Sequence, residues 1–396
     1  MTSPATAPWR ITIDASLLAY PRKTGIARYL EALLPRLARL AGSKAAFTLL
    51  AGGPIRHPTA LGLLAEGVVR ARTFRSPSLH LWQQLGMGLQ IGRCRAEAHL
   101  APEGLLPLGV RCPTVGVVHD LIWARVPGAA AAHVRLVFRL RQRRSLKRFD
   151  VAFADSEFTR RDCLRAFGPV AERLEVLPLG VDLEVFRPLA ADEAESAARF
   201  RARLGLPERF LLAVGNPQRH KNLGRVLEAV ARLDAQGAPR PMLAIVGVGG
   251  LQQLRSAGPS ARPDRVRWIA SLEDDDMAWA LRTAEAMIFP SLYEGFGLPV
   301  LEAMASGTPV LYSGRASLPE VAGEAGLVFD AEDPSALAEA IRRLLGDPAL
   351  RAELGRRGRA RAEQLSWDRH ARRCWEALAE LAERRRARNR GDRAGS

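Results

Sequence analysis

The segment Phe289–Val310, with the sequence FPSLYEGFGLPVLEAMASGTPV, constrains the fold more than any other stretch of the chain. The apolar run that leads into it, Ala284–Phe289, has the composition of a buried parallel strand. Gly295 and Gly297 then interrupt regular structure, and Pro299 suits the first turn of a helix. The segment therefore predicts a strand, a glycine loop, a short helix and a second strand. The unpaired amides at the start of that helix would form a site for an anion.

Two glutamates flank this predicted anion site, Glu294 in the loop and Glu302 in the first turns of the helix. Carboxylates should repel a phosphate, but they fit well if each accepts hydrogen bonds from sugar hydroxyls. The motif EGFGLPVLE, which begins at Glu294 and ends at Glu302, resembles the donor-binding motif of family 4 of the retaining, nucleotide-sugar-dependent glycosyltransferases. That family has the GT-B fold, and the resemblance covers residues 10–380.

The resemblance implies an α/β protein with two doubly wound Rossmann-like domains that face a central cleft. The alternation of strands and helices along the 396 residues, too many for one ordinary core, favours the same arrangement. We expect an acceptor-side domain over residues 1–185, joined by a crossover helix over 366–383, and a nucleotide-sugar-binding domain over 186–365. Residues 384–396 are predicted to form a disordered basic tail.

Two positions in the first half follow predicted strands. Gly25 lies in the loop between a strand at Trp9–Ser16 and an amphipathic helix at Ile26–Leu40, where a glycine lets a phosphate approach the backbone. The sequence TGIARYL resembles the family element that faces the donor diphosphate. His119 ends the strand Thr114–Val118, at the edge where α/β proteins bind ligands. A lone histidine there is often structural, but VVHDL resembles the family's cleft histidine, which contacts the transferred sugar.

A basic segment in the second half follows the predicted strand Phe210–Val214. Basic side chains between a strand end and a helix start form a phosphate clamp, and Asn222 is expected to cap that helix. Lys221 matches the lysine that binds the donor diphosphate in the family. The chain departs from the family at Asn216, where many members have an arginine, and Arg219 is a candidate replacement.

The resemblance implies a front-face displacement in which the leaving diphosphate takes the acceptor's proton. Fixed charges and amides neutralise the leaving group, so neither a metal nor another cofactor is expected. The run Glu273–Asp276 could mimic a metal-binding Asp-x-Asp motif, but acids in the first turn of a helix capped by Ser271 explain it without a metal. The predicted catalytic residues are Glu294, Lys221 and His119, and the predicted donor-binding residues are Gly25, Arg219, Lys221, Gly295, Phe296, Gly297, Leu298 and Glu302.

The net charge of +16 is concentrated in the first half, where residues 1–185 contain 26 basic and 14 acidic side chains. Such a surface would attract an anionic membrane, and the basic helix His133–Arg148 could lie on it, although an ordinary solvated surface explains both features as well. Four scattered cysteines, no secretory signal and no membrane-spanning run predict a cytoplasmic protein. We expect it to bind peripherally on the inner face of the plasma membrane.

The phrases HDL and EGFGLP most resemble bacterial mannosyltransferases of O-antigen (lipopolysaccharide) and exopolysaccharide assembly. They imply transfer of a hexose, mannose first, from GDP-mannose to a saccharide or a polyprenyl-diphosphate-linked saccharide. Transfer to a small soluble acceptor is an alternative. A nucleic-acid-binding protein is another, but the chain lacks an aromatic-rich basic motif and that function would leave both glutamates and Lys221 unexplained. We therefore expect no nucleic-acid partner.

Overall fold

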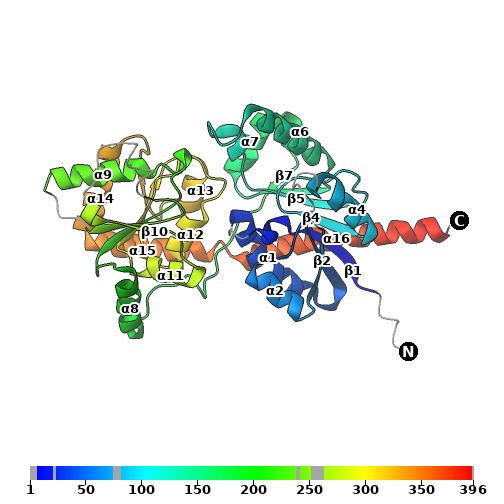
Figure 1. The fold of residues 1–396 in the computed structure, drawn as a ribbon, viewed down its shortest axis with the longest axis horizontal. Helices are drawn as coiled ribbons and strands as arrows, with labels where there is room; N and C mark the ends of the chain where they lie inside the picture. Colours follow the sequence, from blue (N-terminus) through cyan, green and yellow to red (C-terminus); the bar gives the residue numbers. More distant parts are fainter. Residues whose placement is uncertain (1–6, 21–23, 75–81, 238–240, 251–262, 395–396) are drawn as a thin grey trace. The chain divides into compact units, whose positions relative to one another are not determined.

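The computed structural model describes residues 7–20, 24–74, 82–237, 241–250 and 263–394. The chain forms two compact units (Figure 1). The first contains the described residues up to Pro178 and those from Trp367 onward, and the second contains Leu179–Ser366. The division lies before the predicted boundary at residue 185 because Val181 pairs with the end of the second unit, where its backbone N–H donates to the Leu365 carbonyl at 3.1 Å.

In the first unit, the described residues form a seven-stranded parallel sheet in the order β3-β2-β1-β4-β5-β6-β7. The winding direction reverses between β1 and β4, which makes this the switch point of the sheet. The sequence pattern does not predict β4, because its residues AHLA include no β-branched side chain. The strands are β1 (Trp9–Asp14), β2 (Ala45–Ala51), β3 (Val69–Thr73), β4 (Ala98–Ala101), β5 (Thr114–Val118), β6 (Val151–Ala154) and β7 (Leu174–Val176).

The helices of the first unit follow the apolar periodicity of the sequence, with two differences. The helix predicted to start at Ile26 begins at Gly25, so Gly25 opens the helix and does not lie in the loop before it. A π-helical turn, Trp82–Gly86, comes directly before the helix Met87–Arg93 and breaks its regular periodicity. The α-helices are α1 (Gly25–Ala41), α2 (Pro58–Ala65), α4 (Met87–Arg93), α5 (Ile122–Arg125), α6 (Ala132–Arg148), α7 (Glu157–Phe167) and α16 (Trp367–Ala394).

The second unit contains a six-stranded parallel sheet within the described ranges, in the order β10-β9-β8-β11-β12-β13, with its switch point between β8 and β11. Its strands are β8 (Phe210–Val214), β9 (Met242–Val246), β10 (Val266–Ile269), β11 (Ala286–Phe289), β12 (Val310–Ser313) and β13 (Leu327–Phe329). Its α-helices are α8 (Ala194–Leu204), α9 (Leu223–Ala235), α11 (Asp274–Thr283), α12 (Leu298–Ala305), α13 (Leu318–Ala322), α14 (Pro334–Gly346) and α15 (Pro348–Glu363).

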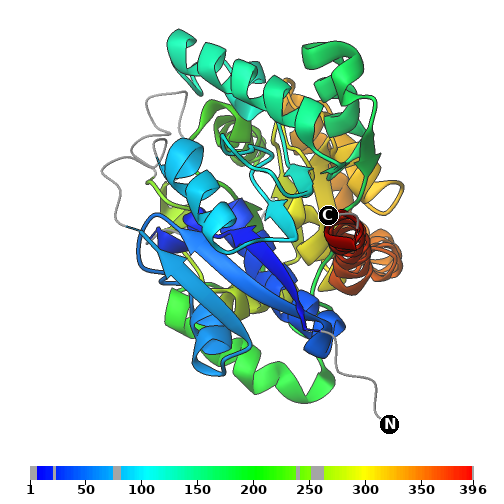
Figure 2. The same ribbon diagram turned by 90° about the vertical axis from the view of Figure 1, so that its right-hand side faces the viewer.

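Helix α16 corrects the prediction of a disordered tail after residue 383, because it continues to Ala394 (seen end-on in Figure 2). The crossover helix does pack on the first unit, as expected. Its last turns have a specific partner: Arg386 donates to both carboxylate oxygens of the buried Glu97, at 2.8 and 2.9 Å. Burial disfavours the Glu97 carboxylate, but hydrogen bonds from Arg386 and Arg10 outweigh it and lower the pKa of Glu97.

We expect Arg386→Ala to lower the free energy of unfolding by roughly 2–3 kcal/mol, since a buried carboxylate loses one of its two arginine partners. Urea denaturation at pH 7 measures this, with Arg388→Ala, an exposed arginine of the same helix, as the matched control. Because the pKa of Glu97 is lowered in the folded chain, the ionised carboxylate stabilises the fold above the ordinary glutamate pKa. This stabilisation is lost as the pH falls through the pKa of Glu97 in the folded chain. The free energies of unfolding of Arg386→Ala and Arg388→Ala should therefore converge as the pH falls. Equal free energies of unfolding at pH 7 would contradict the prediction.

Candidate active site

The switch point of the second unit brings two predicted catalytic residues together. Lys221 ends the 3-10 turn Arg219–Lys221 that follows β8, and Glu294 lies in the loop after β11. The Lys221 Nζ donates to the Glu294 Oε1 at 2.7 Å, and both side chains are mostly buried. The ammonium also lies 5.7 Å from the ring centre of Phe289. The sequence analysis placed both residues at the site but did not predict that they form an ion pair.

The glycine loop has the local structure that its sequence predicts. Helix α12 begins at Leu298 with Pro299 in its first turn, and Gly297 is its N-cap. Gly297 has a φ of +103°, and a Cβ there would lie 2.6 Å from the Cδ2 of Leu318, so both backbone conformation and space require glycine. Gly295 and Phe296 are buried, and Glu302 is 5% exposed. The predicted donor-binding residues of this segment therefore cluster around the first turns of α12.

Two side chains that the sequence analysis did not assign correctly fix the loops of this site. The Ser317 hydroxyl is shared between the carbonyls of Glu294 and Phe296, at 2.9 and 2.8 Å. Asn222 was expected to cap α9, but its amide instead donates to the carbonyls of Pro290 and Ala331, at 3.3 and 2.8 Å. Asn222 has a left-handed backbone with a φ of +55°, which turns its side chain away from the helix start.

The other predicted positions near this site are less tightly placed. Arg219 is exposed, and the buried Oδ1 of Asn216 has no hydrogen-bond partner among the described residues. Helix α11 begins at Asp274 with Glu273 as its N-cap, so Ser271 is not the cap that the sequence predicted. Asp276 pairs with Arg203. Within the described ranges, no three His, Cys, Asp or Glu side chains are grouped in a way that could hold a metal ion.

His119 of the first unit lies at the carboxyl end of β5, beside Asp155 at the end of β6. The His119 Nδ1 and the Asp155 Oδ2 are 2.6 Å apart. Burial by itself disfavours the charged ring, but the charge and hydrogen bond of Asp155 outweigh it and raise the pKa of His119. The start of α7 fixes the loop, because the Thr159 hydroxyl donates to the His119 carbonyl and Ser156 caps the helix.

Helices α1 and α16 pack behind His119. The Tyr29 ring meets the His119 ring edge-on, with their centres 4.9 Å apart. The Tyr29 hydroxyl lies 3.1 Å from the Nε2 of His370, whose Nδ1 lies 3.0 Å from the Pro178 carbonyl. Burial lowers the pKa of His370 to about 4, so this ring is neutral at physiological pH. A buried aromatic and polar network thus fixes one side of the His119 ring.

Three carboxyl groups near His119 escaped the sequence analysis. Asp14 ends β1, Glu103 follows β4, and Asp155 follows β6, so with His119 they mark four neighbouring strand ends. The rule that identified His119, a polar side chain just after a parallel strand, also applies to Asp155, but not to Asp14, which lies inside the strand predicted over Trp9–Ser16. It could not reach Glu103, because β4 itself was not predicted.

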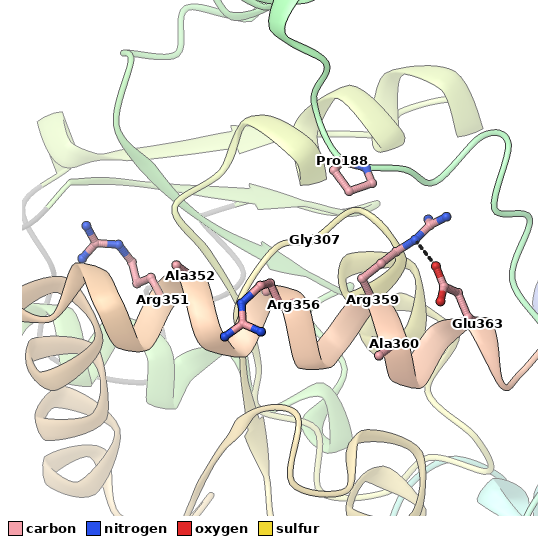
Figure 3. A pocket seen from close by; sticks show the side chains of 9 residues that line it. Pro188, Gly307, Arg351, Ala352, Arg356, Arg359, Ala360 and Glu363 are labelled. Atoms are coloured by element: carbon pink, nitrogen blue, oxygen red, sulfur yellow. Dashed lines mark hydrogen bonds and ion pairs between the residues drawn. The ribbon is translucent and has the colours of Figure 1, made fainter.

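The second unit also contains a cavity of about 440 Å³ that is separate from these residues (Figure 3). It lies between α15 and the positions Pro188 and Gly307, at the opposite end of α12 from the glycine loop. Its Arg359 is already engaged: the Nε donates to Glu363 at 2.9 Å, and the Nη1 donates to two backbone carbonyls. We therefore assign the chemistry to the strand ends and not to this cavity.

Comparison with known proteins identifies the family. The family model described as glycosyltransferase family 4 matches residues 24–185, and the model described as glycosyl transferases group 1 matches residues 195–361. A D-inositol 3-phosphate glycosyltransferase of Acidothermus cellulolyticus is 32% identical over 341 residues, which are 78% of this chain and 69% of that protein. The chain belongs to the group 1 and family 4 glycosyltransferases. The recognition made from the motif EGFGLPVLE is thereby confirmed.

Other relatives of this glycosyltransferase match a shorter region. The O-antigen chain mannosyltransferase B of Escherichia coli is 32% identical over 54% of this chain and 56% of that protein. The MMP alpha-(1->4)-mannosyltransferase of Mycolicibacterium hassiacum is 32% identical over 57% of this chain and 53% of that protein. The chain thus spans about half the length of these curated relatives.

Solved structures confirm the fold of the glycosyltransferase. HepE of Anabaena, in complex with UDP and glucose, has a TM-score of 0.73 at 17% identity and covers 94% of this chain and 100% of that one. WaaG, a glycosyltransferase involved in lipopolysaccharide biosynthesis, has a TM-score of 0.70 at 17% identity over 93% of this chain and 99% of that one. Both units therefore adopt the Rossmann-like architecture of GT-B enzymes.

Proposed function

We propose that this glycosyltransferase retains the anomeric configuration and transfers mannose from GDP-mannose to a saccharide or a polyprenyl-diphosphate-linked saccharide. The observation that carries the proposal is the Lys221–Glu294 pair beside the first turn of α12. It places a cation, a carboxylate and the N-terminal end of a helix within one loop cluster, which suits a diphosphate joined to a sugar. The choice of mannose rests on the two mannosyltransferase relatives.

A small soluble acceptor is the second candidate. It is favoured by the D-inositol 3-phosphate glycosyltransferase of Acidothermus cellulolyticus, which matches more of this chain than either mannosyltransferase does. The donor could then carry a different sugar or base. The two candidates share the same donor-site chemistry and differ in the acceptor, so a comparison of acceptors separates them.

The proposed mechanism uses Lys221 as the fixed charge for the leaving group. Its ammonium pairs with the Glu294 carboxylate. An ammonium has three N–H donors, so Lys221 can keep Glu294 as one partner and still donate to a diphosphate oxygen. As the bond between the sugar and the diphosphate breaks, negative charge grows on the diphosphate, and Lys221 and the positive end of the α12 dipole stabilise it. The acceptor hydroxyl oxygen bonds to the anomeric carbon on the same face, its proton passes to the leaving diphosphate, and we propose that no metal or other cofactor takes part.

A thermal-shift screen of nucleotide sugars tests the function. A donor at 100 times its Kd raises the free energy of unfolding by about 2.7 kcal/mol, so GDP-mannose should raise the Tm clearly. Transfer assays with a saccharide, a polyprenyl-diphosphate saccharide and inositol 3-phosphate then identify the acceptor class, and NMR of the product gives its anomeric configuration. Stabilisation by UDP-glucose alone would replace the donor assignment, and an inverted product would overturn the retaining mechanism.

We expect Lys221→Ala to lower kcat by on the order of 10²-fold, because the charge it neutralises develops in the transition state. Steady-state kinetics measure this, with Lys44→Ala, an exposed lysine of the first unit, as the control. The wild type should keep its activity in EDTA. Loss of activity in EDTA with recovery on adding Mg²⁺ would show that a metal neutralises the leaving group instead.

The two glutamates should affect different kinetic constants. We expect Glu302→Gln to raise the donor KM with little change in kcat, since its proposed contact with the ribose does not change during the reaction. Glu294→Gln should lower kcat by roughly 10²-fold, because a carboxylate near the sugar ring favours the positive charge that develops at the anomeric carbon. Steady-state kinetics and mass spectrometry of the enzyme measure both effects. A sugar trapped on Glu294, or the reverse assignment of the KM and kcat effects, would contradict these roles.

We further propose that the enzyme works in the cytoplasm and binds the inner face of the plasma membrane through α6. This helix carries seven basic residues and no acidic one. Leu136 and Leu140 on it are 58% and 61% exposed, and Arg139 and Arg143 are exposed as well. Apolar side chains among arginines suit the headgroup region of an anionic bilayer. None of the described helices is both long and apolar enough to cross a membrane.

Vesicle co-sedimentation tests this surface. The enzyme should bind vesicles that contain anionic lipid, and binding should weaken as salt rises, because the attraction is screened. Arg139→Glu on α6 should weaken binding several-fold, since each basic residue near such a surface contributes about 1 kcal/mol and reversal replaces attraction with repulsion. Arg232→Glu, the same exposed change on α9 of the second unit, is the control. Equal binding to neutral vesicles, or equal effects of the two changes, would rule out this membrane surface.

A further inference from the structure

The switch point of the first sheet has its own pair of ionisable side chains. Asp14 is the last residue of β1, and Glu103 lies two residues beyond β4, the strand next to β1. Lys221 and Glu294 occupy the corresponding places in the second unit, after β8 and β11. Parallel α/β sheets bind their ligands at this point, outside the carboxyl ends of the strands. The mechanism proposed above leaves Asp14 and Glu103 without a role.

Hydrogen bonds fix the position of both carboxyl groups. Asp14 is 3% exposed, and its Oδ1 accepts from the Ser16 backbone N–H at 2.9 Å. The Trp82 indole donates to the Ser16 hydroxyl at 3.0 Å, which ties this turn to the neighbouring segment. The Gln83 amide donates to the Glu103 Oε1 at 2.9 Å. Glu103 is only partly buried, so a ligand can reach a side chain whose orientation is already set.

The charges around Glu103 favour its neutral form. Burial raises its pKa to about 8, the nearby Asp14 charge adds to this, and the Gln83 hydrogen bond, Arg141 of α6 and His119 oppose it. Burial also raises the pKa of Asp14 to about 6, opposed by Ser16 and Arg141. Two carboxyl groups beside one arginine do not both ionise readily. At neutral pH, Asp14 therefore carries the charge, and Glu103 keeps a proton that it can donate.

The neighbouring His119 provides an independent indication of a ligand. Its buried Nε2 makes no hydrogen bond of normal geometry within the described ranges, although the Pro102 carbonyl lies near enough to favour the charged ring. The Oδ1 of Asp155, a side chain that is 2% exposed, also lacks a partner among the described residues. Buried polar atoms without partners are costly, so their presence beside Glu103 points to a polar group supplied by a ligand.

We propose that Glu103 binds the acceptor, and that its carboxylic acid donates a hydrogen bond to an oxygen of a neutral, hydroxyl-rich acceptor next to His119. This inference rests on the proposed glycosyl transfer and adds an acceptor-binding residue to it. Asp14 keeps Glu103 protonated through its charge and does not touch the acceptor. When Glu103 ionises, its hydrogen-bond donor is lost and a second negative charge takes its place. Binding of the acceptor therefore weakens as pH rises through the pKa of Glu103.

The test is the pH dependence of kcat/KM for the acceptor between pH 6 and 9.5. In the wild type, this constant should fall about tenfold per pH unit above a pH of about 8, through the acceptor KM, while donor binding stays unchanged. Glu103→Gln carries a permanent amide donor, so it should retain activity near pH 7 within several-fold and lose the alkaline decline. Asp14→Asn removes the neighbouring charge and should move the decline to lower pH.

Glu172→Gln, a change at an exposed glutamate of the first unit, is the matched control and should keep the wild-type profile. If the Glu103→Gln variant transfers sugar and shows the same alkaline decline as the wild type, the decline belongs to another group, such as His119, and the inference is overturned. If Glu103→Gln does not fold, the shift caused by Asp14→Asn decides, and an unshifted profile overturns the inference. If the wild type transfers sugar from no nucleotide donor, the proposed function and this inference both fail.

Discussion

A parallel sheet brings the carboxyl ends of all its strands to one edge, and this constraint places the candidate catalytic residues of this chain. Lys221 and Glu294 are far apart in the sequence, yet they meet at 2.7 Å because β8 and β11 are neighbours. His119 and Asp155 meet in the same way after β5 and β6. The strands beside these residues, β8, β11, β5 and β6, are apolar and mostly buried, so the chemistry belongs to the loops that follow them.

The edge is useful only if its loops are rigid, and backbone carbonyls provide the attachment points. Ser317 contacts the carbonyls of Glu294 and Phe296, and Asn222 contacts those of Pro290 and Ala331. These side chains connect loops that follow different strands, so the Lys221–Glu294 geometry is set before a ligand binds. Such preorganisation means that little ordering entropy is lost on binding.

The sequence predicted those parts of the fold that depend on local pattern. Apolar runs bounded by turns gave β5 and β8 with the observed ends, and the glycine and proline positions gave the start of α12. Features that depend on distant residues were missed or wrong. The tail of α16 packs on the sheet through Arg386 and Glu97, a partner 289 residues away, which no local pattern reveals. The Lys221–Glu294 pair and the true partners of Asn222 likewise depend on which strands are neighbours.

The two switch points differ in charge, and the difference separates their ligands. The second unit pairs a lysine with a glutamate next to helix amides, an arrangement that leaves N–H donors for an anion. The first unit places two carboxyl groups together, with Arg141 and His119 as the opposing charges. A phosphate at the edge of the first unit would meet the Asp14 carboxylate and the Glu103 carboxyl group, and the Asp14 charge would repel it. A neutral sugar hydroxyl would not be repelled, and it would find the proton donor of Glu103. These charges support the proposed diphosphate site in the second unit and the proposed binding of an uncharged part of the acceptor in the first.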